Sequence, residues 1–548
     1  MSPVGESVEP PNKRRKLKTD VTTEASSTPP PQSPGDASIA GAAAASLQRP
    51  ISPPSLRKRK PRTPSSSTSQ IEAEVHVTKQ TSTFKGKQQN KSKGLDNTGA
   101  KISKEMRYVR SPIQLTRIKD LGSEQNVDTV TLNDLLGDPM IKECWNFNFL
   151  FDLDFVMGQF DVDVRHMVKV KIVHGFWKNE DANRIALVQS AERYPNIQLI
   201  SAYMPDPFGT HHSKMLVLLR HDDTAQIIIH TANMIPRDWG NMTQAVWQSP
   251  ILPLTSTPLK NENTIHPIGS GPRFKTDLLH YLHAYGNRLH ALTSHLAPYD
   301  FTPIRAAFLA SAPSRQKPST ATSHHTPFGW PGLQQILSTI PTSPTTTPPP
   351  LVIQVSSIAT LGASPTWLTH FHSILSTTAS SPSSQSKATP TALNIIFPTP
   401  HEIRTSLSGY ASGSSIHTKL SSPAQQKQLQ YLHPFLRHWS SPPSPSPSQS
   451  SSPTQESVHT RAHRGPAAPH IKTYILFRDA SFSQIEWALL TSANLSRQAW
   501  GERRNKEGVV GVKSYEVGVC VWPGLFADGG AEAEMVPVFG GMEVVGRA

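Results

Sequence analysis

The stretch PFGTHHSKMLVLL, residues 207–219, holds His212 and Lys214 one residue apart and runs directly into an apolar sequence typical of a buried strand. A second stretch of the same kind, PHIKTYILF, holds His470 and Lys472. Residues i and i+2 of a strand point to the same face, so each His-x-Lys triplet is predicted to present an imidazole and an ammonium group side by side. Brought together, the two triplets would give one pocket two histidines and two lysines.

These four side chains suit phosphoryl transfer through a histidine. A neutral imidazole can attack phosphorus, and an imidazolium can donate a proton to the leaving oxygen. The reference pKa of histidine, about 6.5, allows both forms near neutral pH. A lysine beside each histidine would neutralise the non-bridging phosphate oxygens, which carry much of the transition-state charge. This chemistry needs no metal, and we predict no cofactor.

An asparagine follows each triplet, Asn233 in HTANM and Asn494 in TSANLS, 19 and 22 residues after the respective lysine. An amide there can donate a hydrogen bond to the same phosphate oxygens. A single His-x-Lys triplet is usually only a strand end with a polar face. Here both triplets follow a proline, run into a strand and precede an Ala-Asn pair, so we interpret them as two copies of one unit.

Strand and helix patterns alternate along the chain and then begin again. Residues 168–177 alternate and are β-branched, as a strand requires, and helical periodicity follows at 179–194. Past Thr302 the pattern restarts, with strands at 351–362 and 514–522. We predict an α/β fold with two similar α-β-α sandwich domains related by a pseudo-twofold axis. The predicted ranges are a disordered basic tail at 1–105, domains at 106–300 and 301–548, and Ser/Pro/Thr-rich surface loops at about 313–325, 340–350, 375–390 and 440–465.

The tail carries much of the formal net charge of +14, because the first hundred residues hold 16 Lys and Arg against 8 Asp and Glu. The clusters KRRKLK at 13–18 and RKRKPR at 57–62 resemble a paired nuclear import signal and predict a nuclear protein. The alternative is a solvated charge run that touches nucleic acid weakly. The remaining residues are only mildly basic.

Other features exclude whole classes of protein. No apolar run reaches the roughly 18 residues that a membrane span needs, and the N-terminus lacks an apolar signal region. We therefore expect neither a membrane protein nor a secreted one. Cys144 and Cys520 lie in no CxxC or Cys/His cluster, so we predict buried, reduced cysteines and neither a zinc site nor a disulfide framework.

The paired motifs resemble the phospholipase D superfamily in its tyrosyl-DNA phosphodiesterase (first type) branch. Leu219 and Phe477 stand where the usual superfamily motif, HxKxxxxD, has aspartates, and this branch uses asparagines instead. The resemblance covers most of residues 108–525. It includes the stretches FGTHHSKM, HTANMIPRDW, TQAVW, QVSSIATLG, RTSLSGY, TSANLSRQAWG and SYEVGV.

The resemblance implies a role for each site residue. His212 matches a nucleophile that forms a phosphohistidine with the 3′ end of DNA. His470 matches the general acid that protonates the tyrosine leaving group and then the base that activates water. The residues that match the phosphate-binding set are Lys214, Lys472, Asn233 and Asn494. Those that match residues orienting the two histidines are Gln244 and Glu516. Phe208 matches an aromatic ring that stacks on DNA, and the hydroxyls that match contacts with the DNA backbone are those of Ser356, Ser357 and Ser492.

Each supporting role has a structural alternative. Phe208 could be a core residue, Gln244 a satisfied amide at a strand edge, and the serines at 356–357 a helix cap. Glu516 lies in an otherwise apolar strand, where a carboxylate needs a partner, which favours function. His211 should point away from its neighbour, and we interpret it as structural. We expect His174 and His230 to be packed within strands.

By this resemblance the protein is a nuclear DNA-repair enzyme. It would hydrolyse the 3′-phosphotyrosyl bond between DNA and topoisomerase I fragments, and other 3′ adducts. The expected partners are single- or double-stranded DNA with blocked 3′ ends and a topoisomerase I-derived peptide, with no membrane, and we expect a monomer. The family usually continues past SYEVGV with a Pro/Trp-rich segment and closing strands, whereas residues 523–548 are rich in Gly, Ala and Glu, so we expect a shortened C-terminal domain.

Two other functions stay open on the sequence alone. One is another phospholipase D-type enzyme, a nuclease or a lipid hydrolase. The other is a catalytically impaired protein that binds DNA ends. Turnover of lipid but not DNA would favour the first, and binding of 3′-adducted DNA without turnover would favour the second.

Overall fold

The computed structural model of the 548-residue chain describes residues 111–255, 264–318, 324–343, 347–379, 391–439, 464–527 and 533–537. The predicted basic tail with its two import signals lies outside these residues, as do 319–323, 344–346, 380–390 and 440–463 of the Ser/Pro/Thr-rich segments. No helix of the described part is both long and apolar enough to cross a membrane.

The first half of the chain forms one mixed sheet, in which the strands run in the order β1-β7-β6-β5-β2-β3-β4, with β8 beside β6. Its strands are β1 (Ile113–Leu115), β2 (Ile141–Phe147), β3 (Lys169–His174), β4 (Ile197–Ser201), β5 (Met215–Arg220), β6 (Thr224–His230), β7 (Ala245–Gln248) and β8 (Leu252–Pro253). The central strands β5 and β6 are apolar throughout their cores, because both faces of the sheet are covered.

The second half forms a seven-stranded sheet in the order β15-β13-β11-β16-β17-β19-β9. Its strands are β9 (Ala307–Ser311), β11 (Pro350–Gln354), β13 (Ala392–Ile396), β15 (Leu436–Arg437), β16 (Thr473–Phe477), β17 (Ile485–Thr491) and β19 (Glu516–Val521). Two small ribbons accompany it. They pair β10 (Ser314–Gln316) with β18 (Val510–Val512), and β12 (Ser357–Ile358) with β14 (His417–Thr418).

The two sheets repeat one topology. When β1 to β7 are matched in chain order with β9, β11, β13, β15, β16, β17 and β19, the order of neighbours across the two sheets is the same. The directions agree as well, with β3 parallel to β2 and β4 as β13 is parallel to β11 and β15, and every other matched pair antiparallel. The predicted pair of similar α/β halves is therefore confirmed.

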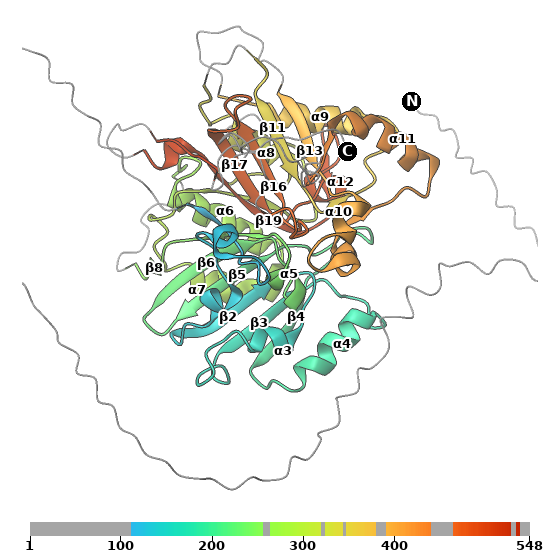
Figure 1. Ribbon diagram of the computed structural model, residues 1–548. Coiled ribbons are helices and arrows are strands. Elements are labelled where there is room, and N and C mark those ends of the chain that lie inside the picture. The colour runs from blue at the N-terminus through green and yellow to red at the C-terminus, as the bar shows by residue number, and fades with distance from the viewer. Residues whose placement is uncertain are drawn as a thin grey trace, which may run out of the picture. The chain divides into compact units, whose positions relative to one another are not determined.

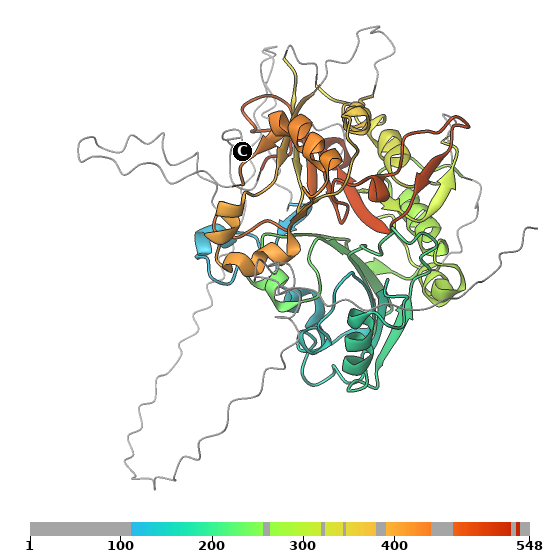
Figure 2. The same ribbon diagram turned by 90° about the vertical axis from the view of Figure 1, so that its right-hand side faces the viewer.

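Helices cover both sheets and also lie between them (Figures 1 and 2). They are α2 (Leu132–Leu136), α3 (Leu153–Met157), α4 (Ala182–Ala191), α5 (Pro236–Gly240), α6 (Gly271–His283), α7 (His290–Leu296), α8 (Trp330–Leu337), α9 (Thr366–Leu375), α10 (Pro400–Arg404), α11 (Pro423–Leu432) and α12 (Arg497–Trp500). One hydrophobic cluster joins β5 and β6 to α6, α7, β9 and β19, so a single core spans both halves. A second cluster lies under α3 and α4, and a third under α8 and α9.

The structure differs from the expectations in three local features. Both His-x-Lys triplets lie immediately before β5 and β16 rather than inside them. Their lysines are still paired like strand residues, because Lys214 O accepts from His230 N and Lys472 O from Thr491 N, each at 3.1 Å. The loop expected at 313–325 contains the short strand β10. Beyond β19, Met535 O accepts from Ile485 N at 2.8 Å, so this segment returns to the second sheet.

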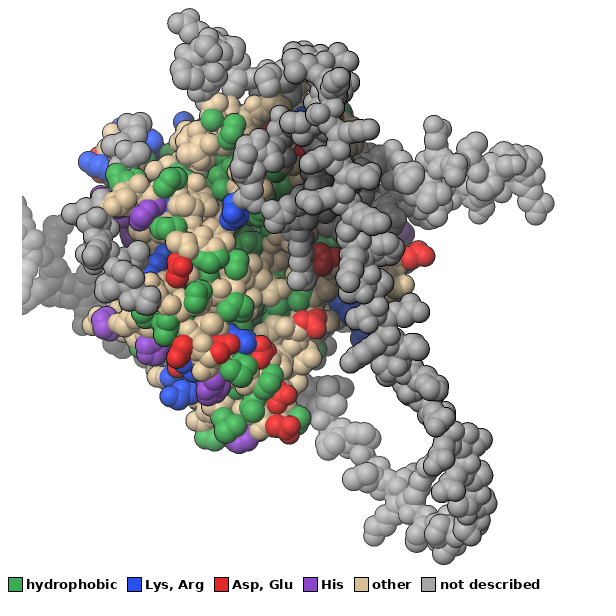
Figure 3. Space-filling model, turned by 90° about the vertical axis from the view of Figure 1, so that its left-hand side faces the viewer, with side chains coloured by type: hydrophobic (Ala, Val, Ile, Leu, Met, Phe, Trp, Pro, Cys, Tyr) green, Lys and Arg blue, Asp and Glu red, His purple; other side chains and the backbone are tan. Residues whose placement is uncertain are grey.

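Acidic and basic side chains of the described residues are intermixed on the face drawn in Figure 3, among many apolar ones. This agrees with the mildly basic composition expected for the folded part. Charge on this face therefore gives no indication of where a polyanion would bind.

Helix α6 depends on a close approach at its first residue. The Ser270 side chain caps the helix by accepting from Arg273 N, and a Cβ at Gly271 would lie 1.7 Å from the carbonyl oxygen of Phe301. We expect Gly271→Ala to force this backbone apart and to lower the free energy of unfolding by about 1–3 kcal/mol. Thermal unfolding would measure it. Gly511→Ala is the control, since its Cβ meets no atom within 4 Å, and an equal loss in both variants would contradict the prediction.

Candidate active site

The first histidine of the site, His212, lies between the carboxylate of Glu516 and the amino group of Lys214. His212 Nδ1 is 3.1 Å from Glu516 Oε2, and its Nε2 is 3.1 Å from Lys214 Nζ. The Phe149 ring lies beside the imidazole, with ring centroids 5.5 Å apart. Because a carboxylate only accepts, it holds a proton on Nδ1 and leaves the Nε2 lone pair for chemistry.

The second histidine has an amide where the first has a carboxylate. His470 Nδ1 lies 2.9 Å from Gln244 Nε2 and 3.2 Å from Gln244 Oε1. The amide can therefore donate to this nitrogen or accept from it, depending on the protonation of the ring. The two predicted orienting residues, Gln244 and Glu516, thus both contact the histidines assigned to them.

Each histidine is held by the half of the chain that does not contain it. His212 N donates to Tyr515 O at 2.9 Å, and His470 N donates to Thr243 O at 3.0 Å. Tyr515 and Thr243 directly precede Glu516 and Gln244, so backbone and side-chain contacts come from the same short segments. The two triplets are therefore brought to one site by reciprocal crossed contacts.

A hydroxyl group anchors each orienting residue from the neighbouring strand end. Ser492 Oγ donates to Glu516 Oε2 at 2.5 Å, and Thr231 Oγ1 donates to Gln244 Oε1 at 2.7 Å. Ser492 is fully buried. The hydroxyl of Ser492 thus has an internal partner, Glu516, and its DNA contact stays a prediction. Thr231 was not singled out in the sequence, although it matches Ser492 in the HTAN and TSAN stretches.

Both lysines are fully buried. Burial lowers the pKa of Lys214 to about 8, against the opposing effect of Glu516 and Asp238. Burial, reinforced by the charge of Lys214, lowers the pKa of Lys472 well below its ordinary value. Lys472 Nζ donates to His470 O. Two buried lysines, each in contact with a histidine of the site, favour an anionic ligand.

The side chain of Asn494 is oriented by two neighbouring serines. Asn494 Oδ1 accepts from the backbone N of Ser356 at 3.1 Å and of Ser357 at 2.9 Å, and from Ser356 Oγ at 3.3 Å. These contacts use the amide oxygen and leave the NH₂ group to donate. Ser356 is buried and contacts Asn494, and its DNA contact stays a prediction. Asn233 is also buried, at the end of β6.

The electrostatics of the histidines are dominated by burial. Burial and the charge of Lys214 lower the pKa of His212, while Glu516 opposes the shift. Burial, with Lys472 and Lys214, lowers the pKa of His470 well below its usual range. For Glu516, burial acts upward, but the contacts with His212, Lys214 and Ser492 outweigh it and lower its pKa. Free His212 is thus a neutral imidazole beside an ionised carboxylate.

The other singled-out residues lie where their chemistry suggests. Phe208 is 73% exposed, with Lys513 Nζ 5.5 Å from its ring centre, so it is not a core residue. The buried His211 turns away from the site and contacts Tyr285 Oη at 3.0 Å. His174 and His230 are buried in β3 and β6. Both cysteines are buried and free, as expected.

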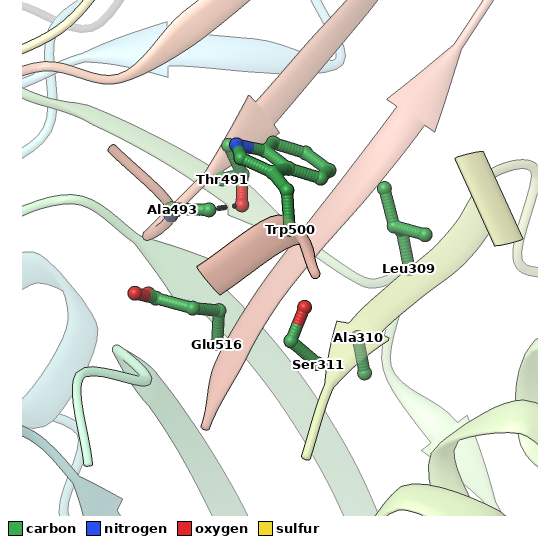
Figure 4. A pocket seen from close by; sticks show the side chains of 7 residues that line it. All are labelled: Leu309, Ala310, Ser311, Thr491, Ala493, Trp500 and Glu516. Atoms are coloured by element: carbon green, nitrogen blue, oxygen red, sulfur yellow. Dashed lines mark hydrogen bonds between the residues drawn. The ribbon is translucent and has the colours of Figure 1, made fainter. Parts of the chain in front are cut away.

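A small pocket borders the site on the side of Trp500 (Figure 4). Its lining is Leu309, Ala310, Ser311, Thr491, Ala493, Trp500 and Glu516. Figure 4 shows the carboxylate of Glu516 directed away from Leu309, Ala310 and Ser311. Within the described ranges, no group of three or more His, Cys, Asp or Glu could hold a metal ion.

One residue near the chemistry was missed in the sequence. Asp238 in α5 is fully buried, and its Oδ2 lies 3.3 Å from His470 Nδ1. It stands in the quoted stretch HTANMIPRDW as the only acid, five residues after Asn233. That position gives no sign of contact with the other half of the chain, because the contact depends on how the halves dock.

The duplicated sheet, with a His-x-Lys triplet beside the central strand of each half, defines a phospholipase D-like protein. The chain belongs to the tyrosyl-DNA phosphodiesterase family and is a phosphodiesterase of that family. A family model described as "Tyrosyl-DNA phosphodiesterase" matches residues 112–542.

Named relatives cover most of the chain. The "Probable tyrosyl-DNA phosphodiesterase" of Schizosaccharomyces pombe is 28% identical over 482 residues, covering 77% of this chain and 83% of the relative. That of Caenorhabditis elegans is 30% identical over 410 residues, covering 73% and 80%. The crystal structure of the yeast tyrosyl-DNA phosphodiesterase shares the fold, with a TM-score of 0.53 and 22% identity over 77% of this chain and 91% of that one.

The His212–Glu516 contact predicts a measurable titration. We expect His212 to titrate below its ordinary pKa and Glu516→Gln to lower its pKa further, because the variant removes the negative charge that opposes desolvation. The His212 ¹³Cε1 signal, assigned with His212→Gln, would follow the pH. Glu486→Gln is the control, since that buried acid pairs with Arg478. An unchanged or raised pKa in Glu516→Gln would contradict the prediction.

Proposed function

We propose that this protein hydrolyses the 3′-phosphotyrosyl bond that links DNA to a topoisomerase I fragment, through a phosphohistidine intermediate. The observation that carries the proposal is the crossed pair of His-x-Lys units, with one histidine beside a carboxylate and the other beside an amide. Family membership supports the leaving group and the nucleic acid, because both named relatives carry the description "Probable tyrosyl-DNA phosphodiesterase". Other 3′ adducts would enter the same site.

In the first step, His212 Nε2 attacks phosphorus and the bond to the tyrosyl oxygen breaks. Glu516 accepts a hydrogen bond from the Nδ1–H group, which keeps its proton, and stabilises the positive charge that develops on the ring. His470 donates a proton from Nε2 to the tyrosyl oxygen. This donation matters because the phenol has a pKa of about 10 and would otherwise leave as an anion. The products are free tyrosine and a DNA 3′-phosphoryl group on His212.

In the second step, a water molecule attacks the same phosphorus from the side that tyrosine has left. His470, now neutral, accepts the water proton on Nε2, and the bond from phosphorus to His212 breaks. The histidine leaves as a neutral imidazole once its Nε2 lone pair is restored. DNA with a 3′-phosphate is released, and His470 is again the acid for the next cycle.

The lysines and asparagines would bind the non-bridging oxygens throughout. In the free protein Lys214 Nζ lies 3.1 Å from the attacking atom, His212 Nε2. A bound phosphate would take over this ammonium group and free the lone pair. The anion would also raise the pKa of Lys214 from about 8 and keep it charged. Substrate binding therefore prepares the nucleophile.

Phe208 would receive an unpaired base near the DNA end. Its ring is exposed and its neighbour Lys513 can contact a phosphate, a combination that single-stranded nucleic acids favour. Ser357 is the one serine of the predicted DNA set that is only partly buried. Nuclear location and a monomeric state stay predictions from the sequence, and the basic clusters behind the first lie outside the described residues.

The intermediate gives the most direct test of the reaction. With single-stranded DNA bearing a 3′-phosphotyrosine, in the presence of EDTA, we expect wild type to release DNA with a 3′-phosphate. His470→Ala should react roughly 10² to 10⁴ times more slowly and leave a covalent protein–DNA adduct on a denaturing gel. His212→Ala should form neither adduct nor product. The exposed His221 provides a matched control, His221→Ala, with the wild-type rate.

Two outcomes would overturn the proposal. An adduct that survives in His212→Ala would place the nucleophile elsewhere. A well-folded wild type that binds this DNA without turnover would leave only end binding, and turnover of a lipid diester instead would change the substrate class.

The exposed ring predicts a separate effect on binding. We expect Phe208→Ala to raise KM for the single-stranded substrate by about 5- to 150-fold, since stacking of one base contributes roughly 1–3 kcal/mol, with kcat nearly unchanged. Steady-state kinetics would measure both constants. Tyr410→Ala, at an equally exposed aromatic residue remote in sequence from both triplets, is the comparison. A fall in kcat alone would contradict a stacking role.

A further inference from the structure

A buried carboxylate reaches the second histidine from the opposite half of the chain. Asp238 is fully buried in α5, and its Oδ2 lies 3.3 Å from His470 Nδ1. The same oxygen accepts from Asn233 N at 2.8 Å. Asp238 Oδ1 is buried and has no hydrogen-bond partner within the part of the chain that the structure describes. An acid in such a place is costly unless a nearby positive group compensates it.

The internal repeat shows what this acid adds. Gln244 directly precedes β7, and Glu516 begins the matching strand β19. Each contacts the Nδ1 atom of the histidine that belongs to the other half. The matched positions therefore differ by one negative charge. Asp238 lies on the side that lacks it and contacts the same nitrogen of His470.

We propose that Asp238 is a positioning residue for His470. Its carboxylate accepts a hydrogen bond from the Nδ1–H group of His470 and supplies the negative charge that Gln244 lacks. This inference rests on the proposed function, in which His470 is first an acid and then a base. Asp238 touches neither phosphate nor tyrosine in this scheme and acts through the imidazole.

The proposed cycle needs such an acceptor in both steps. His470 must exchange its proton at Nε2, so its Nδ1 proton must stay in place throughout. Gln244 alone leaves this undecided, because its amide can present either nitrogen or oxygen to the ring. An ionised carboxylate can only accept, so Asp238 fixes the tautomer with Nε2 as the reactive atom.

Charge around His470 also requires a compensating acid. The positive groups that face it are Lys472 from its own triplet, Lys214 and His212 from the first triplet, and Arg237 from α5. Burial and these charges lower the pKa of His470. Burial raises the pKa of Asp238, and Asn233 N, Lys472, Arg237 and Lys214 oppose that rise. Loss of the carboxylate would therefore make the imidazolium of His470 harder to form.

The leaving group separates positioning of the acid from general damage. We expect Asp238→Asn to lower kcat/KM for 3′-tyrosyl DNA by about 10- to 100-fold. The loss for a 3′-(4-nitrophenyl) ester should be several-fold smaller, because nitrophenolate leaves without a proton. The alkaline limb of kcat/KM for the tyrosyl substrate should move to lower pH. With the nitrophenyl ester, the covalent adduct should accumulate, since His470 also activates water.

A charge-relocation variant tests the specific role. Asp238→Asn combined with Gln244→Glu returns one carboxylate to His470 at the position that Glu516 holds for His212, and we expect it to recover most of the tyrosyl activity. Asp277→Asn is the matched control, because that buried acid contacts Arg273 and Thr326 outside the site. It should lower stability and leave the ratio of the two substrates unchanged.

The outcomes distinguish this inference from the proposed function. If wild type releases neither tyrosine nor nitrophenol, the proposed function fails. If wild type is active and Asp238→Asn slows both esters equally, with no recovery by Gln244→Glu, Asp238 is merely structural and the inference is overturned. Thermal unfolding would check each variant. If Asp238→Asn does not fold, Asp238→Ser replaces it in the same assays. This variant keeps an acceptor for Asn233 N without the charge, and the same results would support or overturn the inference.

Discussion

Reciprocal hydrogen bonds between the two halves are the constraint on which the site depends. Each histidine donates its backbone N–H to the opposite half, to Tyr515 in one case and Thr243 in the other, and the next residue in each segment meets the ring. Neither half alone supplies both the backbone acceptor and the orienting side chain of its own histidine. The hydrophobic cluster that includes α6, β5, β9 and β19 fixes the docking of the sheets, so core packing and the geometry of the site are parts of one problem.

The second constraint is the balance of buried charge. Two lysines and two carboxylates, Asp238 and Glu516, lie within one dry site, and desolvating any one of them alone would cost several kcal/mol. Opposite charges held by fixed hydrogen bonds reduce this cost. The lysines remain under-compensated, because burial lowers the pKa of both. A phosphodiester brings the anion that relieves them, which links substrate binding to the protonation of the site.

The sequence predicted the repeat and the central residues, because strand-period patterns and the His-x-Lys…Asn spacing are local. It placed the triplets within strands, whereas they lie just before β5 and β16. It did not predict that the hydroxyls of Ser492 and Ser356, which it matched to DNA contacts, contact Glu516 and Asn494. A residue type shows that a hydroxyl is present but not which way it turns. Asp238 was missed for a related reason, since its contact with His470 spans the docked halves.

The difference between the two halves follows from the different tasks of their histidines. A nucleophile must keep one fixed proton and one free lone pair, and a single ionised acid hydrogen-bonded to His212 secures both. An acid that becomes a base must change charge during each cycle. At His470 the Gln244 amide lies 2.9 Å and the Asp238 carboxylate 3.3 Å from the same nitrogen, Nδ1. These contacts hold Nδ1, so Nε2 is left to release and take up the proton.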